Sequence, residues 1–172
     1  MAAKDLTKVI EFIDIEARCQ ALGCNVPTGF AILPRNFESA ASKSDLIHED
    51  TTPTVRALFA EKGIVETRIE QDGEKLPYFE ENSYEWIGPI IFVGATVFSQ
   101  NPNLITVGLG VVSNYLTDYF KGRIGEKNAK ISLVIPQPNS KKYTRINYDG
   151  PVDGIKDLEK LIKEVRRGKV KK

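Results

Sequence analysis

The densest group of residues that could do chemistry in this chain lies between Asp45 and Asp50. The segment Asp45-Leu-Ile-His48-Glu49-Asp50 places three carboxylates and the only histidine of the chain within six residues. Carboxylate oxygens and an imidazole could together hold a divalent cation that assists hydrolysis. Asp45, His48 and Asp50 are therefore candidate metal ligands of a small metal-dependent hydrolase. Their spacing matches no established metal motif, so a solvated acidic loop is the interpretation that we favour.

The other reactive side chains give weaker signals. Cys19 and Cys24 stand in the segment CQALGC, with four residues between them rather than the two of a redox C-x-x-C motif. Two cysteines and one histidine cannot supply the four ligands of a structural zinc site. No G-x-S-x-G motif occurs, and His48 would be the only imidazole available to activate a serine or cysteine. We therefore expect buried free thiols and a protein that is not an enzyme.

A glycine motif of the form G-x-G-x-x-S runs from Gly108 to Ser113 after an apolar stretch. Dinucleotide-binding folds use such glycines to bring the backbone close to a pyrophosphate at a helix N-terminus. Here serine replaces the third glycine, and the next predicted strand does not end in the acidic residue that would bind a ribose. We therefore interpret these glycines as close packing contacts and predict no cofactor.

The C-terminal end of the chain is basic. Residues 156–172 contain eight Lys or Arg against three Asp or Glu. Such a helix and tail could dock on an anionic membrane surface, although a solvated helix kept soluble by its lysines is the simpler interpretation. No aromatic residue interrupts the basic run, so the sequence does not favour a nucleic-acid partner. The basic tail consists of Arg166, Arg167, Lys169, Lys171 and Lys172.

The most unusual feature is a run of 32 residues, 86–117, without a charged side chain. The polar segment 99–103 divides it into two apolar runs of 13 residues. A helix of that length is about 20 Å long, shorter than the roughly 30 Å hydrocarbon core of a bilayer, so neither run is a standard transmembrane helix. The run is either a buried core element (a helical hairpin, or a strand plus a helix) or an exposed hairpin that contacts a partner or a bilayer. The candidate contact residues are Trp86, Val97, Phe98, Leu109, Val112 and Tyr115.

These residues need elements to position them, and the hydrophobic pattern predicts an α+β fold in one domain over residues 1–172. Residues 1–80 form a mixed α/β region, residues 81–122 a hydrophobic central element that we expect to be a helical hairpin, and residues 123–172 a ββα unit. In the last of these, residues 130–135 and 143–148 alternate as two strands of a hairpin, and an amphipathic helix follows Asp153.

The mixed region contains several weaker patterns. Apolar spacing favours a helix over residues 5–22, with a strand over residues 9–15 as the alternative. A second helix is predicted from Thr52 to Gly63, because Pro53 suits its first turn. Alternation over residues 64–69 predicts a strand, which Asp72-Gly73 would join to residues 75–79 in a hairpin.

Composition limits the class of protein. The 172 residues are 41% hydrophobic and 27% charged with a net charge of +1, which excludes a disordered chain, a collagen-like fibre and a disulfide-dense miniprotein. The first residues carry no secretory signal pattern, so we expect a cytoplasmic protein, with a location at a membrane surface as the alternative.

Together these observations favour a non-enzymatic accessory or regulatory protein. It would bind another protein, or associate with itself, through the apolar central segment. The alternative is a membrane-active or membrane-peripheral protein whose central hairpin engages lipid while the basic tail docks on anionic headgroups. A small metal-dependent hydrolase comes third. The sequence does not indicate a small-molecule ligand.

Overall fold

The computed structural model describes residues 6–81 and 83–168, and it is built on a five-stranded sheet. The strand order is β1-β7-β6-β5-β2, with β5 and β6 parallel and every other neighbouring pair antiparallel. The chain is thus an α+β protein, as predicted. The sheet strands are β1 (Thr7–Phe12), β2 (Phe30–Leu33), β5 (Trp86–Val93), β6 (Asn128–Pro136) and β7 (Tyr143–Pro151).

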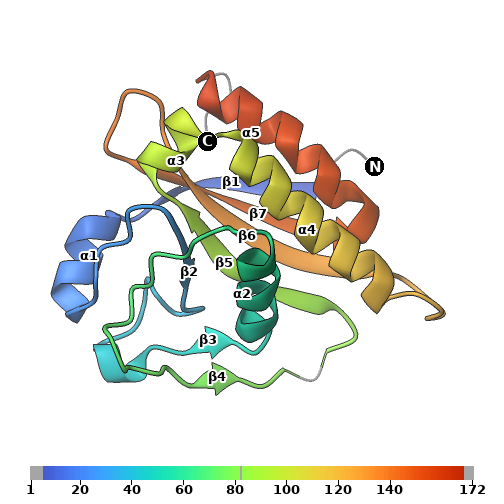
Figure 1. Cartoon of the computed structure of the whole chain (residues 1–172), viewed down its shortest axis with the longest axis horizontal. Helices are drawn as coiled ribbons and strands as arrows, with labels where there is room; N and C mark the ends of the chain where they lie inside the picture. Colours follow the sequence, from blue (N-terminus) through green and yellow to red (C-terminus); the bar gives the residue numbers. More distant parts are fainter. Residues whose placement is uncertain (1–5, 82, 169–172) are drawn as a thin grey trace.

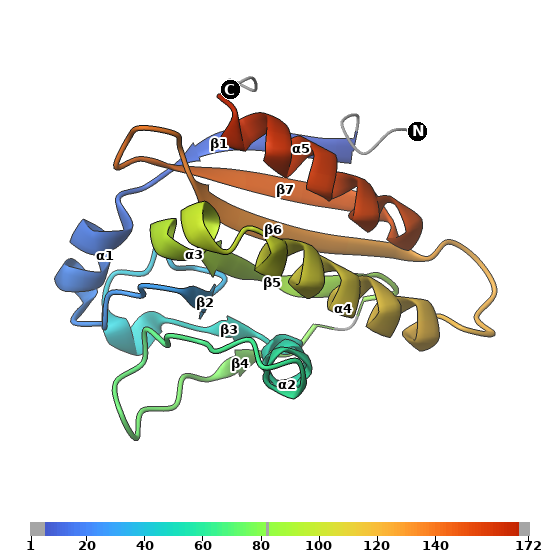
Figure 2. The ribbon, with the colours of Figure 1, turned by 45° about the horizontal axis from the view of Figure 1, so that its top comes forward.

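The sheet carries a hydrophobic core on each face. On one face lie α4 (Asn103–Tyr119) and α5 (Leu158–Arg166), with α2 (Thr52–Glu61) beside them (Figures 1 and 2). Their inward side chains pack against alternate residues of the strands, such as Ile131, Leu133 and Ile146. On the other face, α1 (Ile15–Leu22) and the chain that follows β2 cover only one end of the sheet. The rest of that face carries polar side chains such as Ser132, Arg145 and Asn147, and the partly exposed Ile10.

The uncharged run does not form the helical hairpin that we predicted. Its first part is β5, which pairs with both β2 and β6 inside the sheet. The short helix α3 (Ala95–Gln100) and then α4 complete the crossover to the parallel strand β6. A strand with both faces buried reads as a continuous apolar run, so periodicity could not separate it from a buried helix. The strand-plus-helix alternative is the one observed.

At the N-terminus, the strand alternative is also the one observed. Residues 7–12 form β1, and the helix begins only at Ile15, because the Asp14 side chain accepts a hydrogen bond from the Ala17 backbone N–H. Gly23 ends this helix in the left-handed conformation with φ 69°. The prediction of one helix over residues 5–22 was therefore wrong in its first half.

The predicted hairpin over residues 64–79 is absent. Glu66 makes one isolated parallel bridge to Phe30, and no ladder forms there. Instead β4 (Tyr78–Phe79) pairs in parallel with β3 (His48–Glu49), which lies against the edge of the main sheet near β5. The α2 helix, by contrast, is present with Pro53 in its first turn.

The C-terminal unit is as predicted. β6 and β7 form an antiparallel hairpin in which Ile131 faces Tyr148 and Leu133 faces Ile146. The 3-10 helices η2 (Lys43–Asp45) and η3 (Val152–Asp157) are the remaining elements, and η3 leads directly into α5. The buried side chains of α5 are Leu158, Leu161, Ile162 and Val165. They hold this helix on the sheet beside α4.

Candidate functional site

The helix α4 of the uncharged segment has one side buried in the core and one side exposed at the surface of the molecule. Along α4, Ile105, Leu109 and Val112 recur at helical spacing and point into the core. Trp86 and Phe98 lie in the same core, at 4% and 6% exposure. Four of the six predicted contact residues, Trp86, Phe98, Leu109 and Val112, are therefore buried in the core. Val97 and Tyr115 are partly exposed and pack against this core.

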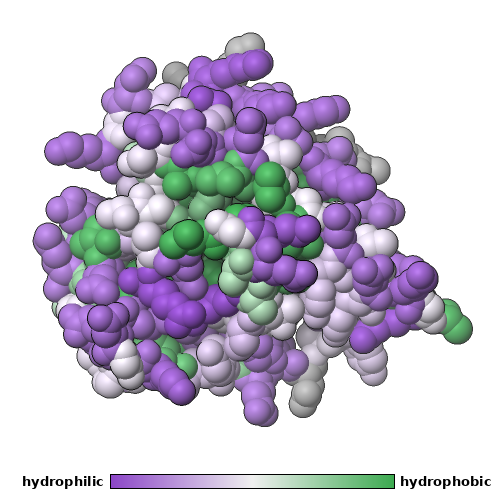
Figure 3. Space-filling view, in the orientation of Figure 1, coloured by the Kyte–Doolittle hydropathy of each residue, from purple (hydrophilic) through white to green (hydrophobic). Residues whose placement is uncertain are grey.

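The opposite side of α4 faces outward and carries no charge between Asn103 and Asn114, and the exposed Asp118 lies one turn further along the same side. Its most exposed hydrophobic side chain is Val107, at 42% exposure, and Leu104 and Val111 are partly exposed on either side of it. We call this surface the outer face of α4, and it comprises Asn103, Leu104, Thr106, Val107, Gly110, Val111 and Asn114. Hydrophobic side chains gather in the middle of this side of the molecule, over α3 and the first half of α4, with hydrophilic groups above and below (Figure 3).

Two glycines of α4 differ in what surrounds them. At Gly108, an added Cβ would lie 3.6 Å from the Phe59 ring, which is an ordinary van der Waals contact, so α4 packs on α2 there with room for a methyl group. At Gly110, an added Cβ would meet nothing within 4 Å. Glycine in the middle of a helix costs about 0.5–1 kcal/mol relative to alanine. No contact within the described chain explains that cost at Gly110. The G-x-G-x-x-S motif lies inside α4 and not at a strand-to-helix turn.

The C-terminal end of α4 is aromatic. Trp86 and Tyr115 have ring centroids 6.4 Å apart, and Tyr115 and Tyr119 have centroids 5.9 Å apart. The Arg123 guanidinium lies 4.3 Å from the centroid of the Tyr119 ring. These contacts hold the end of the helix on the sheet. Tyr119 remains 38% exposed.

The basic tail is only partly within the described residues. Arg166 and Arg167 at the end of α5 are exposed, and Arg166 donates a hydrogen bond to the Ser99 carbonyl oxygen at 3.4 Å. Lys169, Lys171 and Lys172 lie outside the described residues. Within residues 6–81 and 83–168, no helix combines the length and the apolar character needed to cross a bilayer.

The three candidate metal ligands are not brought together as a site. Asp45 and Asp50 are exposed, whereas His48 is buried at 1% exposure. Asp50 Oδ2 accepts a hydrogen bond from the Glu81 backbone N–H, and Asp45 lies in η2. Over the part of the chain that the structure describes, no group of three His, Cys, Asp or Glu residues could hold a metal ion. The hydrolase interpretation gains no support from this arrangement.

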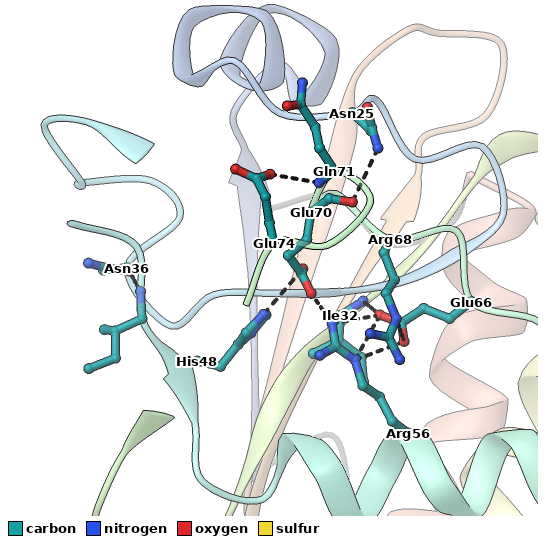
Figure 4. A network of polar contacts seen from close by, with 11 residues as sticks. Asn25, Ile32, Asn36, His48, Arg56, Glu66, Arg68, Glu70, Gln71 and Glu74 are labelled. Carbon is teal, nitrogen blue, oxygen red and sulfur yellow. Dashed lines mark hydrogen bonds and ion pairs between the residues drawn. The ribbon is translucent and has the colours of Figure 1, made fainter. Parts of the chain in front are cut away.

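His48 instead belongs to a buried network of polar contacts (Figure 4). Its Nε2 lies 3.3 Å from Glu70 Oε1, and Arg56 donates to Glu70 Oε2 at 2.8 Å. Arg56 also donates to both oxygens of Glu66, so a single guanidinium joins two carboxylates. His48 comes from β3, Arg56 from α2, and both glutamates from the coil between α2 and β4. The network thus ties three segments together at one end of the sheet.

The ion pairs of this network shift the pKa values of Glu70 and Arg56. Burial raises the pKa of the Glu70 carboxyl, but the His48 hydrogen bond and the Arg56 charge outweigh burial and lower it overall. Burial also lowers the pKa of the Arg56 guanidinium, and its hydrogen bonds and ion pairs with Glu66 and Glu70 more than compensate. Such pairing of a guanidinium with two carboxylates is typical of a structural network. His48 Nδ1 is its one buried side-chain nitrogen without a partner among the described residues.

The two cysteines are free, as predicted. Cys19 is buried in the second core, and Cys24 is partly exposed. Burial and the neighbouring Cys24 raise the pKa of the Cys19 thiol to about 12, and burial also raises that of Cys24. Thiols of such high pKa are poor nucleophiles at neutral pH, so neither supports a catalytic role.

Comparisons with known proteins add nothing to this picture: no family model, no curated protein and no solved structure matches the chain. The function therefore has to be argued from the site itself.

Sequence reasoning identified the right segment but not the residues that face outward. If residues 103–119 are taken as one helix, a period of 3.6 puts Ile105, Leu109 and Val112 on one side and Val107 and Gly110 on the other. That signal was hidden because both sides are apolar. A polar cavity on the other face of the sheet leaves no local pattern, because its lining residues come from five separate segments of the chain.

Proposed function

We propose that this chain is a non-enzymatic binding protein that acts through the outer face of α4, and that a second copy of the chain occupies this face. The observation that carries the proposal is Gly110, a mid-helix glycine that no contact within the described chain requires. It lies beside the exposed Val107 on the outer face of α4, which carries no charge between Asn103 and Asn114.

The glycine bears directly on how a partner would pack. The distance between two packed helices, 8–10 Å, depends on the side chains at their crossing point. A missing Cβ at Gly110 allows another helix to approach closely, and its contacts would offset the cost of glycine to the helix. The partly exposed Val107 and Val111 lie on either side of that position and would be buried by the same approach.

The outer face of α4 has no charged side chain, and this favours an uncharged partner surface. A strongly charged partner surface would lose its hydration against this face without gaining ion pairs, which is costly. An uncharged and partly apolar surface would not, and this chain itself carries one in the outer face of α4. Two copies related by a two-fold axis bring the same patch together, which is the commonest symmetry of soluble oligomers. The mixed charges of α2 and α5 would then form the rim.

The experiment is sedimentation velocity of the purified chain over a range of concentrations. We expect a monomer–dimer equilibrium that Val107→Asp shifts at least tenfold toward monomer, because each buried carboxylate would face an uncharged surface. Ile124→Asp is the matched control, since Ile124 is fully exposed on the loop after α4 and away from this face. It should leave the equilibrium unchanged.

A wild-type chain that remains monomeric at the highest soluble concentration overturns the self-association. Flotation of that monomer with anionic vesicles, with sensitivity to salt, would instead support the membrane-peripheral alternative. An equal loss of dimer in Ile124→Asp would show that the contact lies elsewhere.

A further inference from the structure

The face of the sheet opposite α4 contains a cavity of about 310 Å³, which is at the small end of the range for ligand pockets. It lies between β3 and strands β5, β6 and β7, on the part of the sheet that α1 does not cover. We call this cavity the polar pocket. Its polar lining side chains are Arg35, Glu49, Lys130, Ser132, Arg145 and Asn147.

The floor of the polar pocket is a fixed hydrogen-bond cluster on two neighbouring strands. Ser132 on β6 donates to Asn147 Oδ1 at 2.6 Å, and Arg145 Nε donates to the same oxygen at 2.7 Å. Arg145 also donates to the Ser132 hydroxyl, and it is anchored by Glu38 at 2.8 Å. These two donors fix Asn147 Oδ1 and so orient the amide group, whose nitrogen carries two N–H donors.

Two further cations of the polar pocket are only loosely paired. Arg35 lies 3.4 Å from Glu49 and 3.5 Å from Glu81, and Lys130 lies 3.5 Å from Glu85 and 3.9 Å from Asp149. None of these four contacts is a hydrogen bond, in contrast to the Arg145–Glu38 pair.

The geometry of Arg35 and Lys130 leaves them available to a ligand. The guanidinium of Arg35 stacks on the Phe79 ring at 3.9 Å from its centroid, which fixes its plane. The carboxylates of Glu85 and Asp149 are 37% and 61% exposed, so they can turn toward solvent at little cost. Lys130 therefore presents N–H donors to the polar pocket that a better acceptor could take. Arg35 contributes N–H donors as well, because its contacts with Glu49 and Glu81 are not hydrogen bonds.

Glu49 is the one carboxylate in the lining. The residue is only 7% exposed, and its Oε2 is buried without a hydrogen-bond partner among the described residues. Burial raises the pKa of this carboxyl; Arg35 opposes that shift, and Glu81 and Asp50 add to it. A buried carboxyl oxygen with no partner is costly, and a ligand that supplies a hydrogen-bond donor relieves that cost.

The geometry points to the polar pocket as a binding site for a small molecule that carries an oxyanion, either a carboxylate or a phosphate, next to a hydroxyl group. The oxyanion would accept hydrogen bonds from Arg35, Lys130 and the Asn147 amide, all of which line the polar pocket. The hydroxyl would donate to Glu49. No bond is made or broken, and the site is separate from the outer face of α4 because it lies on the other side of the sheet.

The test is an NMR titration of the ¹⁵N-labelled chain with three probes: glycolate, acetate and inorganic phosphate. We expect glycolate or phosphate to shift the amide resonances of β5, β6 and β7 around the polar pocket. Lys130→Gln and Arg35→Gln should each weaken binding about tenfold, because each removes a charged donor. Lys142→Gln is the matched control, because Lys142 lies in the turn before β7 with a similarly loose ion pair, 3.7 Å from Glu11, and this variant should bind as the wild type does.

Glycolate and acetate differ by one hydroxyl group, so they test the role of Glu49. The wild type should prefer glycolate, and Glu49→Gln, which keeps the shape but removes the charge, should reduce that preference. Binding by phosphate alone would assign the oxyanion as a phosphate, and binding by glycolate alone would assign it as a carboxylate.

Three outcomes overturn the proposal. The first is the absence of any shift up to roughly 10 mM of each probe, well above a weak Kd of about 1 mM. The second is an equal loss of binding in Lys142→Gln, which would show only general attraction to basic groups. The third is a set of shifts confined to residues outside the polar pocket. Val107→Asp should bind the probes unchanged, so failure of the self-association and failure of this site are distinguishable.

Discussion

His48 Nε2 lies 3.3 Å from Glu70 Oε1, and both side chains are buried beneath the edge of the sheet. Glu70 is the centre of this contact, because its second oxygen accepts from Arg56 at 2.8 Å. The segment that carries Glu70 has no sheet ladder of its own. These ionic hydrogen bonds therefore help to fix the coil between α2 and β4, together with the backbone bonds from Thr67 to Phe30 and from Asn25 to Ile69.

Glu70→Gln tests this role. It leaves Arg56 with only Glu66 and removes the charge that faces His48, so we expect a loss of about 2 kcal/mol or more at pH 7. Because the pKa of Glu70 is lowered in the folded state, its stabilisation is complete above its unfolded pKa, near 4.5, and is lost as the pH falls through the lowered value.

The measurement is urea unfolding of both chains at several pH values. The difference between wild type and Glu70→Gln should shrink steadily below about pH 4.5. Glu61→Gln, an exposed glutamate at the end of α2, is the control and should change stability by less than about 0.5 kcal/mol. A difference that stays constant down to pH 3 would contradict the ionic account.

Val112→Asp separates a core role for the uncharged segment from a contact role. The Val112 side chain is completely buried, so an aspartate there creates an unpaired charge in the core. We expect a loss of more than about 4 kcal/mol, which is enough to unfold many domains of this size. Thermal unfolding by circular dichroism checks this. A folded Val112→Asp chain with normal stability would show that α4 does not pack as described.

The sequence predicted those elements whose pattern is local. The β6–β7 hairpin and α5 alternate or repeat at a clear period, and α2 has Pro53 in its first turn, so each was predicted nearly at its true bounds. The strand β5 could not be recognised, because it is covered on both faces and every position from Ile90 to Val93 is buried.

Other features depend on contacts between distant segments. The hairpin predicted at Asp72-Gly73 fails because Glu66 and Glu70 turn inward to Arg56, which no local rule foresees. The polar pocket brings Arg35 and Glu49 to residues more than 80 positions further along the chain. Glu49 belongs to the acidic segment from Asp45 to Asp50, but the sequence analysis did not name it as a candidate binding residue. Its burial is set by packing that a single sequence does not display.

Gly110→Ala is expected to have opposite effects on folding and on association. In the monomer the added Cβ meets nothing within 4 Å, and alanine is the better helix former, so we expect a gain of about 0.5–1 kcal/mol. In the dimer the same methyl group would hold the two helices apart, so association should weaken. Urea unfolding of a dilute sample and sedimentation of a concentrated one measure the two effects. An increase in both the stability of the monomer and the strength of association would show that no helix packs closely at Gly110.

The two cysteines should react at different rates, because Cys19 is buried and Cys24 is partly exposed. The pKa of about 12 for Cys19 leaves roughly one thiolate in 10,000 at pH 8, and the side chain is completely buried, so labelling requires local opening. Cys24 is partly exposed and should react directly. We expect Cys19→Ala to retain the fast phase of reaction with a disulfide reagent and Cys24→Ala to retain only the slow one. Low urea should accelerate the slow phase alone, because it favours the open state; equal rates in the two variants would contradict the burial of Cys19.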